Sequence, residues 1–325
     1  MNFVIVGCGL IGQKRAKALQ AAGHSVHLAV DFIADRAETL AMQYPGASSS
    51  TDWLQSVSAP GVEAVVVATT NEWLAPVTIA AIRSGKHVMV EKPAARTVKE
   101  IDGVIAEAHK AGVHVQVGFN HRYHPALQMA RKLCDSAALG PLLFIRGRYG
   151  HGGRLGYEKE WRANPEISGG GELIDQGVHL IDLARWFLGD FTRVDGHAKT
   201  YFWDMPVDDN AFLNLRTAAD QTAWLQVSCT EWKNLFSMEI YGRDGKLDIQ
   251  GLGGSYGVER IAYYKMLPRM GPPETTIWEY PGGDNSWQLE LTDFDESVRS
   301  GTSRGPTLAD AKAALQVVET IYETV

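Results

Sequence analysis

The chain of 325 residues is predicted to form an α/β domain with a doubly wound parallel sheet, followed by an α+β domain with a largely antiparallel, open sheet. Apolar runs alternate with helical patterns over about the first 120 residues, as in βαβ units. From about Tyr123, short strand patterns follow one another with turn residues between them. This length also fits two domains better than one. We therefore expect domains at residues 1–122 and 123–325.

The first domain is expected to alternate strands and helices. Short apolar runs rich in β-branched residues predict strands, and longer periodic stretches predict helices. The expected strands are 3–6, 25–31, 62–70, 87–93 and 113–119. The expected helices are 13–22, 35–44, 74–85 and 98–112. Such an order predicts a parallel sheet with helices on both faces.

The second domain is expected to hold most of its residues in antiparallel strands. The expected strands are 141–150, 194–202, 210–217, 222–229, 237–251, 260–267 and 275–280. Asp244-Gly245 predicts a hairpin turn inside the fifth of these segments. Helices are expected at 173–188, 287–299 and 307–323, the first of them on one face of the sheet. The other face carries the aromatic residues Trp224, Trp232 and Tyr241 and is expected to form an oligomer interface.

Composition excludes several classes of function. The hydrophobic fraction of 45% and the charged fraction of 21% are those of an ordinary globular protein, and the net charge of −7 argues against nucleic-acid binding. Cys8, Cys134 and Cys229 lie far apart, which argues against a disulfide framework or a zinc ribbon. Neither a signal peptide nor a membrane-spanning run is recognisable. We expect a cytoplasmic protein that has no membrane partner.

A dinucleotide-binding motif follows the first predicted strand. The segment Gly7-Cys8-Gly9-Leu10-Ile11-Gly12 has the spacing G-x-G-x-x-G between a strand and a helix. Gly7 permits the tight turn, Gly9 lets the backbone approach a pyrophosphate, and Gly12 lets helix and strand pack closely. The N-terminus of the helix then faces the anion.

The residue at the end of the next strand indicates which dinucleotide binds. Asp31 follows the last glycine of the motif at the usual distance of about 20 residues. Its carboxylate accepts hydrogen bonds from the ribose hydroxyls of NAD but repels the 2′-phosphate of NADP. Phe32 comes next where a basic side chain would favour the phosphate, and Arg36 lies further along. The sequence therefore favours NAD over NADP.

A lysine is expected at the carboxyl end of the strand that ends in Glu91-Lys92-Pro93. Ligands of open α/β sheets bind at this edge, so Lys92 is expected to point toward the cofactor. There it would hold or exchange a proton with a substrate hydroxyl. Proline after it permits a cis peptide bond. The alternative is a solvated lysine paired with Glu91.

A second polar cluster occurs in the segment GGGELIDQGVHLID, residues 169–182. In a helix, the spacing of Asp175, His179 and Asp182 places their side chains on one face. Three interpretations are open: a metal ligand set, a proton-transfer pair, or the polar face of a capped core helix. A metal is disfavoured because hydride transfer to a nicotinamide needs none. His121 and His124 have ligand spacing but come with no further ligands.

Four segments together resemble the glucose-fructose oxidoreductase and inositol 2-dehydrogenase (Gfo/Idh/MocA) family. They are the G-x-G-x-x-G motif, GKHVMVEKP at 85–93, GFNHRYHP at 118–125 and the segment 169–182. The resemblance implies an N-terminal Rossmann domain and a C-terminal α+β domain whose open sheet often mediates oligomerisation, here into a homodimer or homotetramer. It also implies that Lys92 and His179 contact the reacting hydroxyl and that Asp175 positions the substrate. Asp182 is expected to pack the helix or to support the site.

The resemblance extends to the remaining cofactor contacts. The glycines at 169–171 are expected to let the chain approach the nicotinamide closely. The family commonly has T-P-N followed by histidine where this chain has Thr69-Thr70-Asn71 and then Leu74, which puts the shape of that loop in doubt. The expected cofactor contacts are Gly7, Gly9, Leu10, Ile11, Gly12, Asp31, Thr69, Asn71, Glu91, Lys92 and Asn120.

Substrate contacts are expected from the glycine-rich, charged segment 151–171 and from the residue that begins the second domain. The candidates are Tyr123, Arg154, Tyr157, Trp161 and Arg162. The predicted function is NAD-dependent hydride transfer between the cofactor and a secondary hydroxyl or ketone of a sugar, inositol or related polyol. The alternatives are an NAD-dependent glycosidase that uses transient hydride transfer, and a noncatalytic ligand-binding regulator on the same fold.

Overall fold

A computed structural model describes residues 1–324, and the chain divides into two compact units. The first unit consists of residues 1–119, 166–169 and 287–315, and the second of the rest of the described chain. The expected boundary after residue 122 therefore lies close to the end of the first long segment. Two later segments return to the first unit, which the sequence did not indicate.

The first unit contains the predicted parallel sheet, with strand order β3-β2-β1-β4-β5-β6. The strands are β1 (Asn2–Val6), β2 (Ser25–Val30), β3 (Ser48–Ser50), β4 (Ala64–Val67), β5 (His87–Glu91) and β6 (Val115–Gly118). The order reverses direction at β1, so the carboxyl ends of β1 and β4 form the point where doubly wound sheets bind ligands. The fold class predicted for this part is confirmed.

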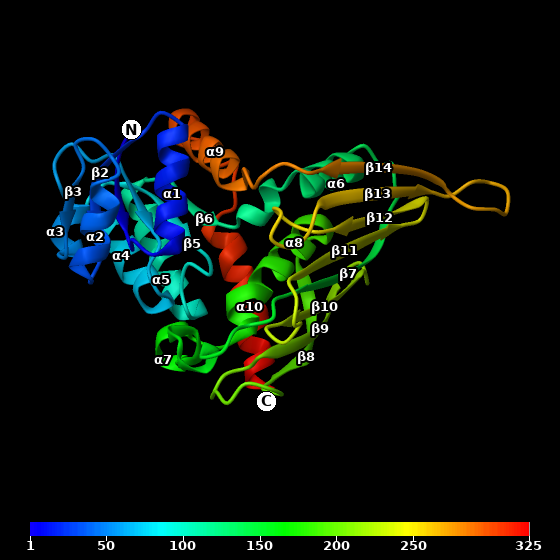
Figure 1. Ribbon diagram of the computed structural model, residues 1–325. Coiled ribbons are helices and arrows are strands. Elements are labelled where there is room, and N and C mark those ends of the chain that lie inside the picture. Colours follow the sequence, from blue (N-terminus) through cyan, green and yellow to red (C-terminus); the bar gives the residue numbers. More distant parts are fainter. Residues whose placement is uncertain (325) are drawn as a thin grey trace. The chain divides into compact units, whose positions relative to one another are not determined.

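Helices connect these strands and enclose the core of the first unit. They are α1 (Leu10–Ala21), α2 (Ala34–Ala41), α3 (Trp53–Val57), α4 (Asn71–Arg83) and α5 (Val98–Ala111). The late helix α9 (Ser286–Ser300) lies beside α1 (Figure 1) and buries Leu291 and Phe294 in the core that Phe3 occupies. That apolar face explains why a segment from the end of the chain belongs to the first unit.

The second unit contains an eight-stranded sheet with the order β14-β13-β12-β11-β7-β10-β9-β8. The strands are β7 (Leu142–Gly150), β8 (Phe191–Lys199), β9 (Asn210–Thr217), β10 (Thr222–Ser228), β11 (Leu235–Gly242), β12 (Gly245–Gln250), β13 (Glu259–Lys265) and β14 (Glu274–Tyr280). All neighbours pair antiparallel except β7 and β10, which pair parallel. The predicted, largely antiparallel sheet and its hairpin at Asp244-Gly245 are confirmed.

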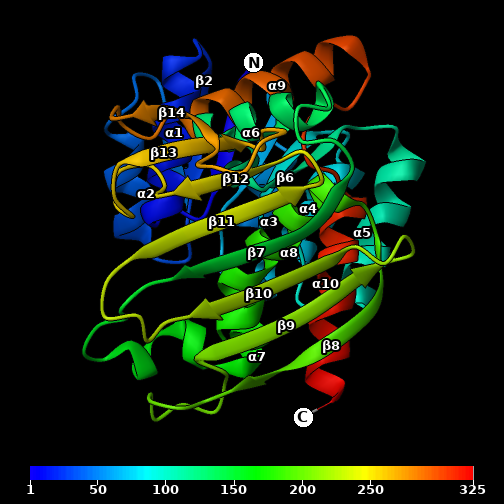
Figure 2. The same ribbon diagram turned by 90° about the vertical axis from the view of Figure 1, so that its right-hand side faces the viewer.

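One face of this sheet is covered and the other is open. Helix α8 (Val178–Leu188) packs on β7 and β10, and α6 (Pro125–Asp135) packs on β12, β13 and β14. The C-terminal end of α10 (Leu308–Glu323) reaches the same side through Tyr322, whose hydroxyl donates to Asp208 at 2.7 Å. Figure 2 shows the other face of the strands, with no described helix in front of it.

Several local expectations differ from the structure. The elements β3 and α3, both very short, were not predicted from the sequence. Helix α6 was not predicted either, because its residues were included in the region expected to hold consecutive strands. The helix expected from residue 173 begins with a π-helical turn, Leu173–Gly177, before α8. Short 3-10 turns occur at 120–123, 157–159 and 161–163, and a single helical turn, α7, at Pro165–Ser168.

Candidate functional site

The glycine motif joins β1 to α1, and each glycine meets a different constraint. Gly7 has φ +96°, and a Cβ there would lie 2.3 Å from the carbonyl oxygen of Ala68. A Cβ on Gly12 would lie 1.9 Å from the carbonyl oxygen of Gly7. A Cβ on Gly9 would meet no described atom within 4 Å, and Gly9 has an ordinary φ of −71°. Protein packing thus explains Gly7 and Gly12, whereas Gly9 leaves open space for a ligand.

The start of α1 fits an anion in that space. Its N-cap is Gly9, no described side chain caps the helix, and its first turn holds no acidic residue. The amide groups of the first turn therefore keep their donors for a ligand, and the helix dipole favours negative charge there. Leu10 is largely exposed at this end, while Ile11 is partly covered. These residues fit the pyrophosphate of a dinucleotide.

Asp31 lies directly after β2 and is held against the glycine motif. Its Oδ2 accepts the N–H of Cys8 at 2.8 Å, and its Oδ1 accepts the N–H of Ile33 at 2.9 Å. Each carboxylate oxygen can accept further hydrogen bonds, so the side chain stays able to bind ribose hydroxyls. Its neighbour Phe32 is 56% exposed and packs its ring 5.2 Å from that of Trp73. The aromatic pair occupies the place where a basic residue would favour NADP.

The other predicted cofactor residues of this sheet edge have partners within their own units. The amide of Asn71, at the start of α4, donates to the carbonyl of Ser168 at 2.8 Å. The hydroxyl of Thr69 donates to the carbonyl of Thr70 at 3.1 Å. In the second unit, the amide of Asn120 donates to the hydroxyl of Ser286 at 2.9 Å. These bonds fix the orientation of the two amides.

Lys92 follows β5, as expected, and the Lys92–Pro93 peptide bond is cis. Glu91 does not pair with Lys92 in the way the alternative interpretation required. Its carboxylate instead accepts from Nε of Arg15 at 2.7 Å, in the interior of the first unit. Lys92 itself is partly buried.

The second unit brings Asp175 and Arg162 together. Nε of Arg162 donates to Oδ2 of Asp175 at 2.8 Å, and the guanidinium stacks 4.6 Å from the ring centroid of Trp161. The charge of Asp175 is the main cause that raises the pKa of Arg162. Asp175 belongs to the π-helical turn, an irregularity that is frequent at functional sites. Two of the predicted substrate candidates thus support a predicted catalytic residue.

His179 lies in the first turn of α8 and packs against a second histidine. The ring centroids of His179 and His121 are 3.7 Å apart, and both side chains are buried. The hydroxyl of Tyr149, on β7, lies 3.5 Å from Nε2 of His121. Burial strongly raises the pKa of Tyr149. His179 is therefore surrounded by aromatic groups that hold its ring in place.

Asp182, the third member of the predicted cluster, forms a buried ion pair with Arg122. Its carboxylate accepts from Nε of Arg122 at 2.8 Å and from Nη2 of Arg122 at 2.5 Å. Asp182 is only 1% exposed. The bidentate pair ties α8 to the 3-10 turn at 120–123, so Asp182 packs the helix.

The glycines before this helix approach neighbours within the second unit. A Cβ on Gly171 would lie 2.0 Å from the carbonyl oxygen of Asp208, and one on Gly170 would lie 2.3 Å from the hydroxyl of Tyr322. The carboxylate of Asp208 accepts the N–H groups of Gly171 and Leu173 at 3.0 and 2.8 Å. These contacts hold the start of the π-helical turn that carries Asp175.

A buried acid–base pair lies beside Asp175. Oε1 of Glu172 is 3.5 Å from Nε2 of His151, and the hydroxyl of Tyr157 donates to Oε2 of Glu172 at 3.4 Å. Burial raises the pKa of Glu172, although His151 acts against that shift. Burial lowers the pKa of His151, but Glu172 outweighs it and the net shift is upward.

The remaining substrate candidates occupy different environments. Tyr157 is 5% exposed and forms part of the cluster around Glu172, and Tyr123 is 6% exposed in the 3-10 turn before α6. Arg154 points outward and pairs with Glu160 at 2.6 Å. Tyr157 therefore belongs to the group around Glu172 and Asp175.

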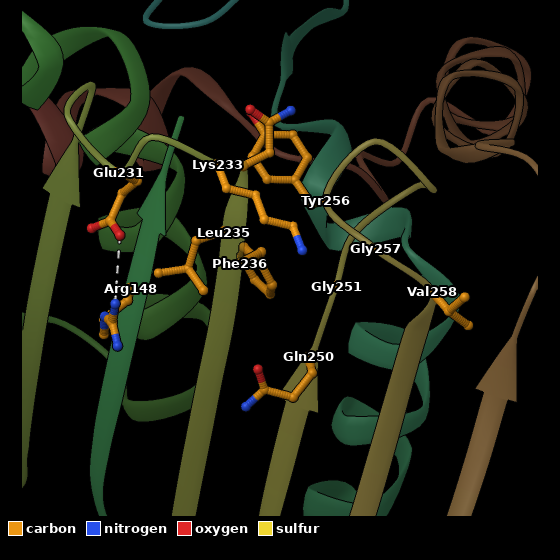
Figure 3. A pocket seen from close by; sticks show the side chains of 11 residues that line it. Arg148, Glu231, Lys233, Leu235, Phe236, Gln250, Gly251, Tyr256, Gly257 and Val258 are labelled. Atoms are coloured by element: carbon orange, nitrogen blue, oxygen red, sulfur yellow. Dashed lines mark ion pairs between the residues drawn. The ribbon is translucent and has the colours of Figure 1, made fainter. Parts of the chain in front are cut away.

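A pocket of about 380 Å³ lies at the ends of β11 and β12 (Figure 3). Figure 3 shows the side chains of Lys233, Leu235 and Gln250 extending into it. Tyr256 is part of the lining, and its ring lies 5.2 Å from that of Tyr149. Through Tyr149 the pocket adjoins the pair of His121 and His179. The full lining is Arg148, Glu231, Lys233, Asn234, Leu235, Phe236, Gln250, Gly251, Tyr256, Gly257 and Val258.

Sequence reasoning missed several residues of these groups, among them His121, Tyr149, Glu172 and His151. His121 was interpreted as an ordinary surface or pocket histidine, because no cysteine or carboxylate partners accompany its i+3 spacing to His124. Glu172 lies within the segment 169–182, three residues before Asp175. This position next to the predicted polar cluster could have identified it as a candidate. Tyr149 and His151 carry no local signal, because strand pairing and loop folding bring them to the cluster.

Within residues 1–324, every helix is too short or too polar to span a membrane. No group of three or more His, Cys, Asp or Glu side chains in the same part of the chain is arranged to hold a metal ion.

Two dehydrogenases align with most of the chain. It is 26% identical over 329 residues to scyllo-inositol 2-dehydrogenase (NAD(+)) of Bacillus subtilis, covering 98% of this chain and 92% of that protein. It is 25% identical over 317 residues to levoglucosan dehydrogenase of Pseudarthrobacter phenanthrenivorans, covering 85% and 81%. Among solved structures, levoglucosan dehydrogenase in complex with NADH and levoglucosan superposes with a TM-score of 0.89 at 23% identity, covering 100% of this chain and 96% of that one.

Two family descriptions match consecutive parts of the sequence. Residues 1–119 match the oxidoreductase family with an NAD-binding Rossmann fold. Residues 127–248 match the GFO/IDH/MocA C-terminal domain. Together with the glycine cradle, Asp31 and the open eight-stranded sheet, these matches show that the chain belongs to the NAD-binding GFO/IDH/MocA family of oxidoreductases.

Proposed function

We propose that the protein oxidises a secondary hydroxyl of a sugar, inositol or related polyol with NAD, or reduces the matching ketone. Relatives that act on inositols and levoglucosan support this substrate class. NAD binding is assigned to the domain at residues 1–122 and substrate binding to residues 123–325. The observation that carries the assignment is the buried pair of Asp175, oriented by Arg162, and His179, one helical turn apart on the same segment.

Each of three residues is assigned a separate task. His179 accepts the proton of the reacting hydroxyl, because an ordinary imidazole is present in both protonation states near neutral pH. Lys92 donates a hydrogen bond to the same oxygen, and Asp175 accepts one from an adjacent hydroxyl. NAD, when bound, supplies the acceptor for the hydride. Arg162 holds the carboxylate of Asp175 in a fixed orientation, so that a polyol is held by at least two hydroxyls.

The first experiment is a screen of sugars, inositols and sugar acids with NAD at high pH, with NADH formation followed by absorbance. A dehydrogenase accumulates NADH in proportion to the substrate that is consumed. Glycoside cleavage without net NADH would favour the glycosidase alternative, and ligand binding without any turnover would favour the regulator. Either result would overturn the proposal.

The second experiment tests His179 once a substrate is known. His179→Ala is expected to lower kcat by about 10²- to 10⁴-fold, the usual effect of losing a general base. NAD affinity, measured by calorimetry, should change little, because the glycine cradle and Asp31 lie in the other unit. The exposed His109→Ala is the matched control. Near-normal kcat in His179→Ala would show that the proton goes elsewhere, with Lys92 or Tyr123 as the next candidate.

We also propose that the chain forms a homodimer or homotetramer through the open face of the eight-stranded sheet. That face carries Trp224, which is 46% exposed, together with the ion pair of Arg146 and Glu239 at 2.6 Å. A two-fold arrangement would place the same patch on both partners. Light scattering should then give a mass well above the 35.6 kDa of one chain. A strict monomer at micromolar concentration would contradict this proposal.

The three cysteines support a cytoplasmic location. Cys8, Cys134 and Cys229 are all free thiols. Burial is the main cause that raises the pKa of Cys8, to about 12. Fractionation of source cells would test the assignment, and recovery of the protein outside the cytoplasm would overturn it.

A further inference from the structure

Arg15 is buried beneath the end of β5 and binds two carboxylates. Its Nε donates to Oε1 of Glu91 at 2.7 Å, and its NH1 donates to Oε2 of Glu290 at 2.5 Å. The three side chains are almost inaccessible, with 2% of Arg15, 8% of Glu91 and none of Glu290 exposed. The guanidinium also lies 4.5 Å from the ring centroid of Trp287. Three segments that are far apart in the sequence therefore meet at one charge, all within the first unit.

This arrangement is costly to bury, so its geometry is tightly defined. Burial lowers the pKa of Arg15, but the charges of Glu290 and Glu91 outweigh it and the net shift is strongly upward. Arg15 is thus always charged, and it serves as the common partner of both carboxylates. Removing one partner of a buried pair typically destabilises a protein, whereas replacing the whole group by neutral side chains of similar volume is often tolerated.

Glu91 immediately precedes Lys92, and the backbone on both sides of the lysine is held. On one side, Arg15 fixes the Glu91 side chain. On the other, the N–H of Ala94 donates to the carbonyl of Glu91 at 2.9 Å and closes the turn. A Cβ on Gly118 would lie 2.7 Å from NH2 of Arg15 and 3.0 Å from Oε2 of Glu91, so a glycine on β6 leaves the room for this ion pair.

We propose that Arg15 and Glu290 are positioning residues for Lys92. Glu290 orients Arg15, Arg15 anchors Glu91, and Glu91 sets the start of the turn from which the Lys92 side chain extends. Helix α9 thereby contributes to the catalytic lysine from a position about 200 residues further along the chain. The expected loss of kcat rests on the proposed catalytic role of Lys92. The expected change in the placement of the Lys92 side chain does not.

The decisive variant is Glu290→Gln, which preserves shape but removes the charge that orients Arg15 and so loosens its hold on Glu91. The readout independent of activity is the rate at which trinitrobenzenesulfonate modifies Lys92, measured by peptide mass spectrometry. Lys92 is partly buried in the protein, so a turn that has lost its anchor should be modified several-fold faster. Lys110, exposed at the end of α5, reports general loosening and should not change.

The kinetic readout compares the change in kcat with the change in the Kd of NAD. A catalytic group displaced by about 1 Å can cost on the order of 100-fold in rate. We expect Glu290→Gln to lower kcat by about 10- to 100-fold, with little change in the Kd of NAD. The control is Glu107→Gln, which removes the partner of Arg83 in an exposed ion pair of the same unit and should leave both readouts unchanged.

A triple variant separates positioning from folding. Arg15→Met combined with Glu91→Gln and Glu290→Gln removes all three charges, and the folded protein should show the same faster modification of Lys92. Unchanged modification and unchanged kcat in Glu290→Gln would overturn the proposal whether or not the triple variant folds. Equal acceleration at Lys92 and Lys110 would also overturn it, because the effect would then be general loosening.

The outcome for Lys92 itself distinguishes this inference from the proposed function. If Lys92→Ala keeps full activity, the catalytic role of Lys92 fails. The modification rate of Lys92 in Glu290→Gln would still decide whether the buried ion pairs position that side chain.

Discussion

Nε of Arg162 donates a hydrogen bond to Oδ2 of Asp175 at 2.8 Å, and this bond joins the 3-10 turn at 161–163 to the π-helical turn at 173–177. Charge-assisted bonds of this kind are about twice as strong as neutral ones. The two residues are thirteen positions apart, and only the folded loop brings them together. Asp175 therefore depends on Arg162 for its orientation.

Arg162→Met is expected to raise KM and lower kcat together, because Asp175 would lose the guanidinium that orients its carboxylate. We expect kcat/KM to fall on the order of 100-fold, the effect of misplacing a substrate-binding group. Steady-state kinetics measure both constants. Arg243→Met is the control, since Arg243 pairs with Asp244 on the surface. A change in KM smaller than that of the control would show that Arg162 does not orient Asp175.

The glycine motif allows stability and cofactor binding to be separated. Gly12→Ala forces a Cβ against the carbonyl oxygen of Gly7 and should destabilise the fold by about 1–3 kcal/mol, the usual cost of overpacking. Gly9→Ala meets no described atom and should keep the unfolding free energy, yet weaken NAD at least about tenfold, or 1.4 kcal/mol. Urea unfolding and calorimetry provide the two measurements.

Gly103→Ala is the matched control for both glycine variants. Gly103 lies inside α5, where an added Cβ has room, so alanine should stabilise the helix by up to about 1 kcal/mol and leave NAD binding unchanged. If Gly9→Ala binds NAD as tightly as the unmodified protein, the pyrophosphate does not lie over Gly9.

Cofactor choice is expected to depend on Asp31. The unmodified protein should bind NAD more tightly than NADP. Asp31→Ala should reduce this difference in affinity, because the repulsion of the 2′-phosphate is lost. Calorimetric titration with both dinucleotides measures the difference. Asp35→Ala, on the exposed start of α2, should leave it unchanged. NADP bound as tightly as NAD by the unmodified protein would refute the assignment.

The pair of Glu172 and His151 predicts how stability depends on pH. Both pKa values are raised in the folded protein from ordinary values of 4.5 and 6.5. A raised pKa means that the folded state holds the proton more tightly, so the stabilising contribution is complete below the unfolded pKa and is lost as the pH rises. The unfolding free energy should therefore fall from about pH 4.5 upward, through the neutral range.

Glu172→Gln should flatten this dependence, because it removes one titrating group and the cause of the raised pKa of His151. Urea unfolding at a series of pH values, with the variant subtracted from the unmodified protein, isolates the contribution. Glu274→Gln, exposed on β14, is the control. If the unfolding free energy of the unmodified protein minus that of Glu172→Gln grew with rising pH, the raised pKa values of Glu172 and His151 would be contradicted.

Local patterns in the sequence determined the fold class and the cofactor edge. The strand runs of the first unit, Gly7, Gly9, Gly12 and Asp31 could be identified because strand periodicity and the G-x-G-x-x-G spacing are short-range properties. Lys92, Asp175 and His179 were predicted as site residues from motifs in the same way, and their roles stay predictions. The short elements β3 and α3 were missed because a few residues carry too little periodicity to stand out.

Only the tertiary structure decided which residues act as partners of these groups. Glu290 reaches Arg15 because α9 returns to the first unit, and Tyr149 reaches His121 because β7 lies in the middle of the second sheet. Arg162 was proposed to bind substrate, and the structure shows that it holds Asp175. Such contacts depend on how apolar faces pack over long sequence separations, and no local spacing encodes them.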